Sequence, residues 1–302
     1  MRNAVLTKRR KGLGEEAKLA YVLLFPAVLL MVIFMVYPIF YVFIISLFKT
    51  DKLSRIKDFA GFGIYFKLLS SKDTWIVIGR SILWTVTAVA TKTLFGIIIA
   101  LTLNVKYHGR KIARLLFIIP WASSIPISVM LWRWVLHNEF GLLNYTLKIT
   151  GIMSNPPVWL GQIGTAFISC LWVDIWIGIP FMALVFLAAM QAVPQTLYEA
   201  AEIDGATRAQ RFRYVTLPGI SAILLIATLL SSLWTFNDFN TIYILTNGGP
   251  AGTTNILITY VYMNSFEWLK WQKASALSVF TFLILSVVSV VYSKVYFRKE
   301  EA

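Results

Sequence analysis

Cysteine, histidine and charged residues are scarce in this chain of 302 residues. The single cysteine, Cys170, lies in an apolar segment, so neither an internal disulfide nor a cysteine-based metal site is available. The two histidines, His108 and His137, are far apart and lack the spacing of metal ligands. Charged residues make up 14% of the chain, where a soluble protein has about a quarter. The remaining apolar excess must therefore be buried in lipid.

Sequence motifs for several kinds of chemistry are also missing. No G-x-x-x-x-G-K-[ST] motif occurs, and the turn Gly248-Gly249-Pro250 lacks the lysine that a phosphate loop needs, so this chain cannot hydrolyse ATP alone. Neither H-E-x-x-H nor G-x-S-x-G is present, which argues against an intramembrane enzyme. We expect no catalytic residue, metal or cofactor in this chain.

The chain is strongly basic, with a formal net charge of +14. On a soluble protein such a charge suggests nucleic-acid binding. Here the basic residues lie beside apolar runs, and no basic-aromatic patch is visible. We therefore expect membrane lipid around this protein and no nucleic acid.

Long apolar segments recur along the chain. A membrane helix needs about 20 mostly apolar residues, and six segments qualify. They are Leu19–Phe48, Ile76–Leu103, Leu115–Leu136, Gly161–Met190, Pro218–Leu245 and Ala274–Phe297. This predicts an all-α integral membrane protein with six transmembrane helices in one domain, 19–297, between tails at 1–18 and 298–302.

Lysine and arginine near the segment ends predict the orientation. The tail before the first segment, the loops 104–114 and 191–217, and the C-terminal tail are rich in these residues, so both termini should face the cytoplasm. The basic loop 49–75 is an exception. The first apolar run is too long for a cleaved signal peptide, and we interpret it as a retained anchor.

The polar loop 191–217 has the pattern of two short helices. Pro194 suits the start of a helix over Gln195–Ile203, and Gly205 suits its end. A second helix is expected from Thr207 to Val215, capped by Thr207 or Asp204. An ordinary amphipathic helix on the membrane surface is the alternative interpretation.

The spacing of this loop resembles the "EAA" loop of ABC-importer permeases of type I. Val215 departs from the isoleucine more usual there. The resemblance implies a cytoplasmic loop that docks on an ATPase subunit, with ATP and magnesium held by two such subunits. It also implies a second, homologous permease subunit in a heterodimer. The matching coupling residues are Glu199, Ala200, Ala201, Gly205, Leu217 and Pro218.

Further motifs resemble the carbohydrate-uptake branch of that family, and in particular the larger maltose-transporter permease without its extra N-terminal helices and external domain. They are Tyr37-Pro38, the run Leu131–Trp134 leading to Gly141–Asn144, and the run Thr246–Pro250. Arg80-Ser81 departs from the Asn-Thr usual in that branch. The resemblance implies a bacterial or archaeal cytoplasmic membrane and a sugar delivered by an extracytoplasmic binding protein. Trp159, the turn 247–252 and the stretch 256–271 are the expected contacts with that protein, and a place in the membrane interface stays open for the last.

Two segments carry candidate solute contacts. Gly178 and Pro180 predict a break in the fourth span. In the fifth span, four residues with polar groups are spaced at i, i+3, i+4 and i+7 and should share one helical face. They are Ser231, Trp234, Thr235 and Asp238. The resemblance implies that a sugar site is lined by Ile177, Gly178, Phe181, Ser231, Trp234, Thr235 and Asp238. The alternative is that the stripe packs against a neighbouring helix.

Three ionisable residues lie within the apolar segments, namely Lys92, Asp174 and Asp238. Such residues are costly in a membrane unless they are paired or hydrated, and we expect Lys92 to pair with an aspartate or to reach the interface. A proton or ion relay in a secondary transporter remains an alternative function. A further alternative is an ABC permease for a non-sugar solute such as glycerol phosphate or an amino acid.

Overall fold

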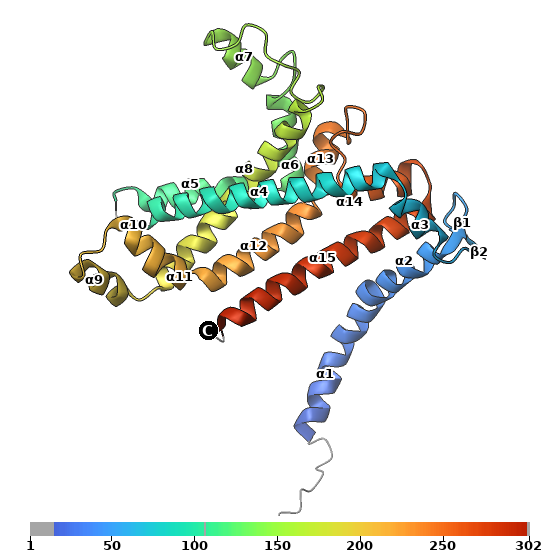
Figure 1. Cartoon of the computed structure of the whole chain (residues 1–302), viewed down its shortest axis with the longest axis horizontal. Helices are drawn as coiled ribbons and strands as arrows, with labels where there is room; N and C mark the ends of the chain where they lie inside the picture. Colours follow the sequence, from blue (N-terminus) through green and yellow to red (C-terminus); the bar gives the residue numbers. More distant parts are fainter. Residues whose placement is uncertain (1–14, 106, 301–302) are drawn as a thin grey trace, which may run out of the picture.

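The computed structural model describes residues 15–105 and 107–300. The predicted N-terminal tail falls mostly outside these residues. Long helices dominate the fold (Figure 1). Within the described residues, five helical stretches are long and apolar enough to span a membrane, and a bent helix pair makes a sixth if it is counted as one span. The five are Ala17–Leu47 (α1 Glu15–Met31, η1 Val32–Val36 and α2 Tyr37–Leu47), α4 (Lys72–Asn104), α8 (Thr165–Ala192), Ser221–Thr246 (α12 Ser221–Phe236 and α13 Phe239–Thr246) and α15 (Trp271–Glu300).

The expected third span is not straight. It is divided into α5 (Arg110–Ala122) and α6 (Ile125–Val135), whose axes differ by 92°. Pro126 has no N–H to donate to the carbonyl of Ala122, and proline suits the first turn of a new helix. Ser123 and Ser124 accordingly take extended backbone angles between the two helices. The prediction of one continuous helix over Leu115–Leu136 was therefore wrong.

Short elements fill the connections. The basic loop after the first span holds a small antiparallel hairpin, which the all-α expectation did not include. The short elements are β1 (Phe48–Thr50), β2 (Ile56–Phe59), α3 (Gly63–Leu69), α7 (Leu142–Ile149), α9 (Gln195–Ile203), α10 (Arg208–Arg211), η2 (Phe212–Thr216), α11 (Leu217–Gly219), α14 (Leu257–Tyr262) and η3 (Met263–Glu267).

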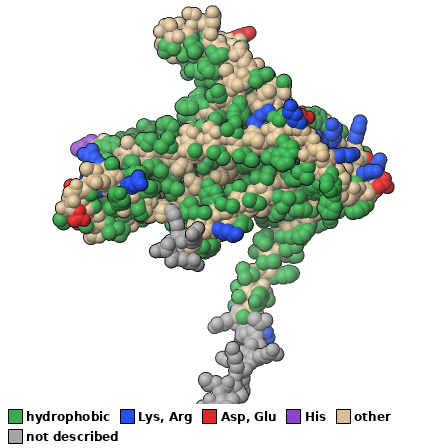
Figure 2. All heavy atoms as spheres, in the orientation of Figure 1, with side chains coloured by type: hydrophobic (Ala, Val, Ile, Leu, Met, Phe, Trp, Pro, Cys, Tyr) green, Lys and Arg blue, Asp and Glu red, His purple; other side chains and the backbone are tan. Residues whose placement is uncertain are grey.

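The body of the molecule is formed by α4, α8, α12 and α15 (Figure 1). The loop before α5, the α9–α10 segment and the C-terminal end of α15 lie at one end of these helices, and the hairpin β1–β2 lies at the other. Lys and Arg side chains gather towards these two ends, with mostly apolar surface between them (Figure 2). That distribution suits a bilayer, whose core excludes charge.

The first span stands apart from this body. All residues from 18 to 35 are exposed, and α2 rather than α1 packs against α15 (Figure 1). No described residue covers its apolar side chains, so they require lipid or another protein around them.

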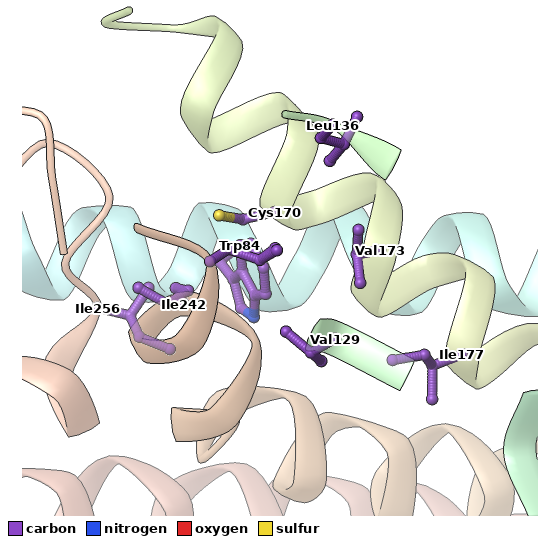
Figure 3. Close-up of a cluster of buried hydrophobic side chains, with 9 residues drawn as sticks. Trp84, Val129, Leu136, Cys170, Val173, Ile177, Ile242 and Ile256 are labelled. Atoms are coloured by element: carbon purple, nitrogen blue, oxygen red, sulfur yellow. The ribbon is translucent and has the colours of Figure 1, made fainter. Parts of the chain in front are cut away.

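One hydrophobic cluster sits where α4, α6, α8, α13 and the segment before α14 meet (Figure 3). Trp84 of α4 is fully buried at its centre, with Ile242 and Ile256 on one side and Val173 on the other. The indole N–H of Trp84 donates to the carbonyl of Thr235 at 3.1 Å. This bond ties α4 to the C-terminal end of α12.

Helices α4 and α8 approach closely because small residues line their contact. A Cβ added to Gly96 would lie 2.8 Å from the Cβ of Met182 and 3.2 Å from its backbone carbon. Close backbone approach at small residues is a common way for membrane helices to associate. The separation of α4 and α8 therefore depends on the absence of a side chain at position 96.

We expect Gly96→Ala to destabilise the protein by about 1–3 kcal/mol, because the two backbones must move apart. Gly79→Ala is the matched control on the same helix, since nothing lies within 4 Å of a Cβ there. Thermal unfolding of the purified protein in detergent, followed by tryptophan fluorescence, measures both. Equal melting temperatures for the two variants would contradict the close approach.

Candidate functional site

A cavity of about 680 Å³ opens among α4, α5, α8, α12 and α13. Its lining comes from parts of the chain that are distant in sequence. All seven residues that the sequence predicts as solute contacts line this cavity: Ile177, Gly178, Phe181, Ser231, Trp234, Thr235 and Asp238. The structure therefore brings them together in one place, which packing against a single neighbouring helix would not require.

A buried ion pair closes one side of the cavity. The Nζ of Lys92 lies 2.7 Å from Oδ2 and 2.8 Å from Oδ1 of Asp174. The same ammonium donates to Oγ1 of Thr235 at 2.9 Å. This arrangement joins α4, α8 and α12 at one point. It confirms the prediction that Lys92 pairs with an aspartate.

Gly178 makes room for this pair. A Cβ at position 178 would lie between 2.6 and 3.0 Å from Cε, Cδ and Nζ of Lys92. The lysine side chain thus runs across the face of α8 at the glycine. Gly178 is required for space here and not for backbone flexibility, because α8 continues through it.

That continuity corrects one prediction. Gly178 and Pro180 suggested a break in the fourth span, but α8 is one helix from Thr165 to Ala192. Pro180 removes a single backbone donor, and membrane helices tolerate this where neighbouring groups compensate.

The break lies in the fifth span instead. Helix α12 ends at Phe236, and α13 begins at Phe239. Asp238 is the N-cap of α13, and its Oδ1 accepts a hydrogen bond from the backbone N–H of Thr241 at 3.1 Å. The predicted continuous stripe from Ser231 to Asp238 was wrong in geometry, although all four members reach the cavity.

Three aromatic rings form another part of the cavity wall. The ring centroids of Trp121 and Phe181 are 5.6 Å apart, and those of Phe181 and Trp234 are 5.1 Å apart. The rings come from α5, α8 and α12 and all line the cavity. Flat apolar rings beside hydroxyl and amide groups suit a ligand that has both C–H faces and hydroxyls.

Sequence reasoning missed several lining residues. They are Trp121, Ser123, Ile125, Leu233, Asn237, Asn240 and Thr241, together with Lys92 and Asp174, which it had noted as intramembrane charges, with Asp174 one turn before Gly178 and so able to face the pore. The amides of Asn237 and Asn240 flank Asp238 within an apolar segment. Polar residues in that position were the signal that a break and a site lay there.

The second predicted site, the α9–α10 turn, has the expected local structure. Helix α9 covers Gln195–Ile203, and Gly205 follows with a φ of +73°. Thr207 caps α10 in a capping box, in which its hydroxyl accepts from the N–H of Gln210 and the Gln210 side chain accepts from the N–H of Thr207. Only the end of the second helix differs, because η2 follows at Phe212.

Glu199 and Ala200 of this turn are exposed, and Ala201 is partly buried. The Glu202 carboxylate lies 3.3 Å from the Arg211 guanidinium, whereas the structure shows no ion pair for Glu199 among the described residues. Leu217 and Pro218 are exposed too, but they lie in α11 and line a separate hollow with Ser221 and Leu224.

Residues in the loops at the other end of the molecule form hydrogen bonds within the chain. A guanidinium nitrogen of Arg80 donates to the carbonyls of Gly252 and Asn255 at 2.7 and 2.9 Å, so the residue that departs from the family pattern holds the turn 247–252. The Trp159 indole donates to Asn144 at 2.6 Å.

The stretch 256–271 is not a free surface over its first part. Ile256 and Leu257 are fully buried, and Tyr260 is nearly so. These residues pack the segment against α4 and α15. Their helical spacing had instead predicted contact with a partner or with the membrane interface. That part of the expectation was wrong.

Comparisons with known proteins agree with this architecture. Residues 92–299, more than half of the chain, match the family described as "Binding-protein-dependent transport system inner membrane component". The trehalose/maltose transport system permease protein of Thermococcus litoralis is 35% identical, over 95% of this chain and 96% of that protein. The sulfoquinovosyl glycerol transport system permease protein of Agrobacterium fabrum is 30% identical, over 95% of this chain and 93% of its own length.

Among solved structures, a chain of a bacterial ABC transporter involved in the import of the acidic polysaccharide alginate superposes with a TM-score of 0.82, covering 94% of this chain and 96% of that one. At 22% identity this likeness shows the fold, that of a type I ABC-importer permease. The relatives are transport permeases and not enzymes. This chain belongs to the family of inner-membrane components of binding-protein-dependent transport systems.

Proposed function

We propose that this chain forms one half of the pore of an ATP-driven importer, and that it moves a sugar or oligosaccharide delivered by an extracytoplasmic binding protein. The observation that carries this proposal is the cavity, which combines three aromatic rings with hydroxyl, amide and carboxylate groups inside the membrane-spanning body. The relatives named for trehalose/maltose and for sulfoquinovosyl glycerol support the sugar class.

The partners follow from this role. A second, homologous permease completes the pore, and two ATPase subunits bind ATP and magnesium. A solved structure of the alginate transporter in complex with a pentasaccharide-bound periplasmic protein, whose matching chain has a TM-score of 0.79 to this one, supports a delivery protein as a further partner. In this arrangement both termini and the α9–α10 turn face the cytoplasm.

The geometry suggests how ATP hydrolysis would be coupled to movement of the solute. The α9–α10 turn lies between α8 and α12 in the chain, and both of these helices carry residues of the cavity (Figure 1). An ATPase subunit that moves the turn would therefore pull on two walls of the cavity together. Opening and closing of the cavity to either side of the membrane would follow from that movement.

The alternative of a proton- or sodium-driven transporter has less support. A relay needs a series of groups that exchange protons, but Lys92 and Asp174 are held together in a nearly buried pair, which leaves Asp238 as the one other ionisable residue of the described cavity lining. A permease for a phosphorylated solute would need a free cationic group, and the described lining of the cavity has no cation besides Lys92.

The proposed function is tested by purifying this chain from its native membrane in mild detergent and identifying the proteins that accompany it by mass spectrometry. We expect an ATPase subunit and a second permease of similar length. Recovery of the chain alone, or only as a homo-oligomer, would contradict the proposal.

We expect Glu199→Arg to reduce the ATPase subunit recovered with this chain at least fivefold, because the exposed carboxylate of α9 is the proposed contact. Glu139→Arg makes the same change at an exposed glutamate in the loop before α7, far from the α9–α10 turn, and should leave recovery unchanged. Quantitative blotting of both proteins measures the ratio. Undiminished recovery with Glu199→Arg would exclude this contact.

We expect Trp234→Ala to lower solute uptake by about tenfold, because a stacking ring worth roughly 1.4 kcal/mol is removed from the cavity wall. Trp172→Ala is the matched control: Trp172 is 54% exposed and Trp234 55%, but Trp172 does not line the cavity. The measurement is uptake of labelled solute by cells that have equal membrane levels of each variant. Equal uptake by both variants would remove Trp234 from the site.

A further inference from the structure

The charges around the cavity carry information about the solute. Of the residues that line it, three are ionisable: Lys92, Asp174 and Asp238. Whether the cavity favours an acidic, neutral or basic solute depends on which of these charges is free to act on a ligand.

The charge of Lys92 is not free. An ammonium group has three N–H donors. Two of them donate to Oδ1 of Asp174 at 2.8 Å and to the hydroxyl of Thr235 at 2.9 Å, and Oδ2 of the same carboxylate lies 2.7 Å from the nitrogen as the ion-pair contact. The Lys92 side chain is only 5% exposed. The positive charge is therefore already balanced by the carboxylate of Asp174 and shielded from a solute.

The position of the lysine side chain at the edge of the cavity is also fixed by its surroundings. Its stem runs against the α-carbon of Gly178, where even a methyl group would be 2.6 Å from Cε. Loss of the ion pair would also leave Asp174 buried and uncompensated, which is strongly unfavourable. The pair therefore acts on a solute as one neutral unit.

Asp238 is different. Its Oδ1 accepts the N–H of Thr241 as the cap of α13, and no described cation lies within ion-pair distance of its carboxylate. The side chains beside it, Asn237 and Asn240, are neutral. Among the described residues, Asp238 is therefore the one uncompensated charge in the lining of the cavity.

We propose that Asp238 makes this cavity selective for saccharides that are uncharged or carry an amino group, and that it excludes saccharides bearing carboxylate, sulfonate or phosphate groups. A like charge placed against a desolvated carboxylate is repelled, whereas an ammonium or a hydroxyl donates a hydrogen bond to it. This inference rests on the proposed sugar-transport function and adds the charge class of the solute.

The test uses the complete purified transporter without its delivery protein, so that only the membrane cavity selects. Equilibrium binding is measured for three labelled β-1,4-linked trimers that share one backbone, of glucose, of glucosamine and of glucuronate. The wild type is expected to bind the glucuronate trimer at least tenfold more weakly than the better of the other two.

The decisive variant is Asp238→Asn. Asparagine caps a helix as well as aspartate does, so α13 keeps its start while the charge is removed. Asp238→Ser is a second neutral cap. With either variant the difference in affinity between the glucuronate trimer and the other trimers should shrink at least fivefold. Asp58→Asn makes the same substitution at an exposed residue of β2 and should leave that difference unaltered.

The outcomes separate this inference from the function beneath it. Binding of the glucuronate trimer to the wild type as tightly as the glucose trimer, or an unchanged difference in Asp238→Asn, would overturn the charge selectivity alone. A different result would count against a saccharide site altogether. In that case the wild type binds none of the three trimers, and the matching monosaccharides do not compete with any other ligand.

Discussion

The contact between Lys92 and Asp174 is the constraint on which the arrangement of the helices depends. Charged groups are expensive in a membrane interior, and a buried pair is tolerable only when its geometry is good and its remaining hydrogen bonds are satisfied. Here that requirement fixes α4, α8 and α12 against one another, with Thr235 and Gly178 set around the ammonium. The aromatic wall and the cap at Asp238 then take their places on helices that this pair has already positioned.

The composition of the chain explains how such a polar centre can persist. Around it the long helices present apolar side chains to their surroundings, and basic residues lie mostly at their two ends (Figure 2). Lipid therefore offers no competing partner to Lys92 or Asp174, since the bilayer core supplies no hydrogen bonds. The polar groups have to satisfy one another, which is why they meet in one cavity.

The sequence predicted some of these features well and others poorly. Helix α9 begins and ends where Pro194 and Gly205 indicated, because helix caps are local signals whose effect does not depend on lipid or on tertiary packing. Breaks within spans were less predictable. Proline suggested one at Pro180, where α8 continues, while the break at Asp238 has no proline or glycine beside it and is set by a side-chain cap. Pro126 accounts for a break at Ser123-Ser124, but the 92° angle between α5 and α6 depends on how α6 packs against α8 and α13, which periodicity does not record.

The capping box of Thr207 and Gln210 has a consequence for the energetics of association. It holds the α9–α10 turn through bonds of its own, together with the bond from the N–H of Ala206 to the carbonyl of Ala201 at 2.9 Å. A surface that is already held in one shape loses little conformational entropy when another protein contacts it. A force applied to the turn then moves it as a rigid body. The reason is that few dihedral angles of a preorganised segment can change easily.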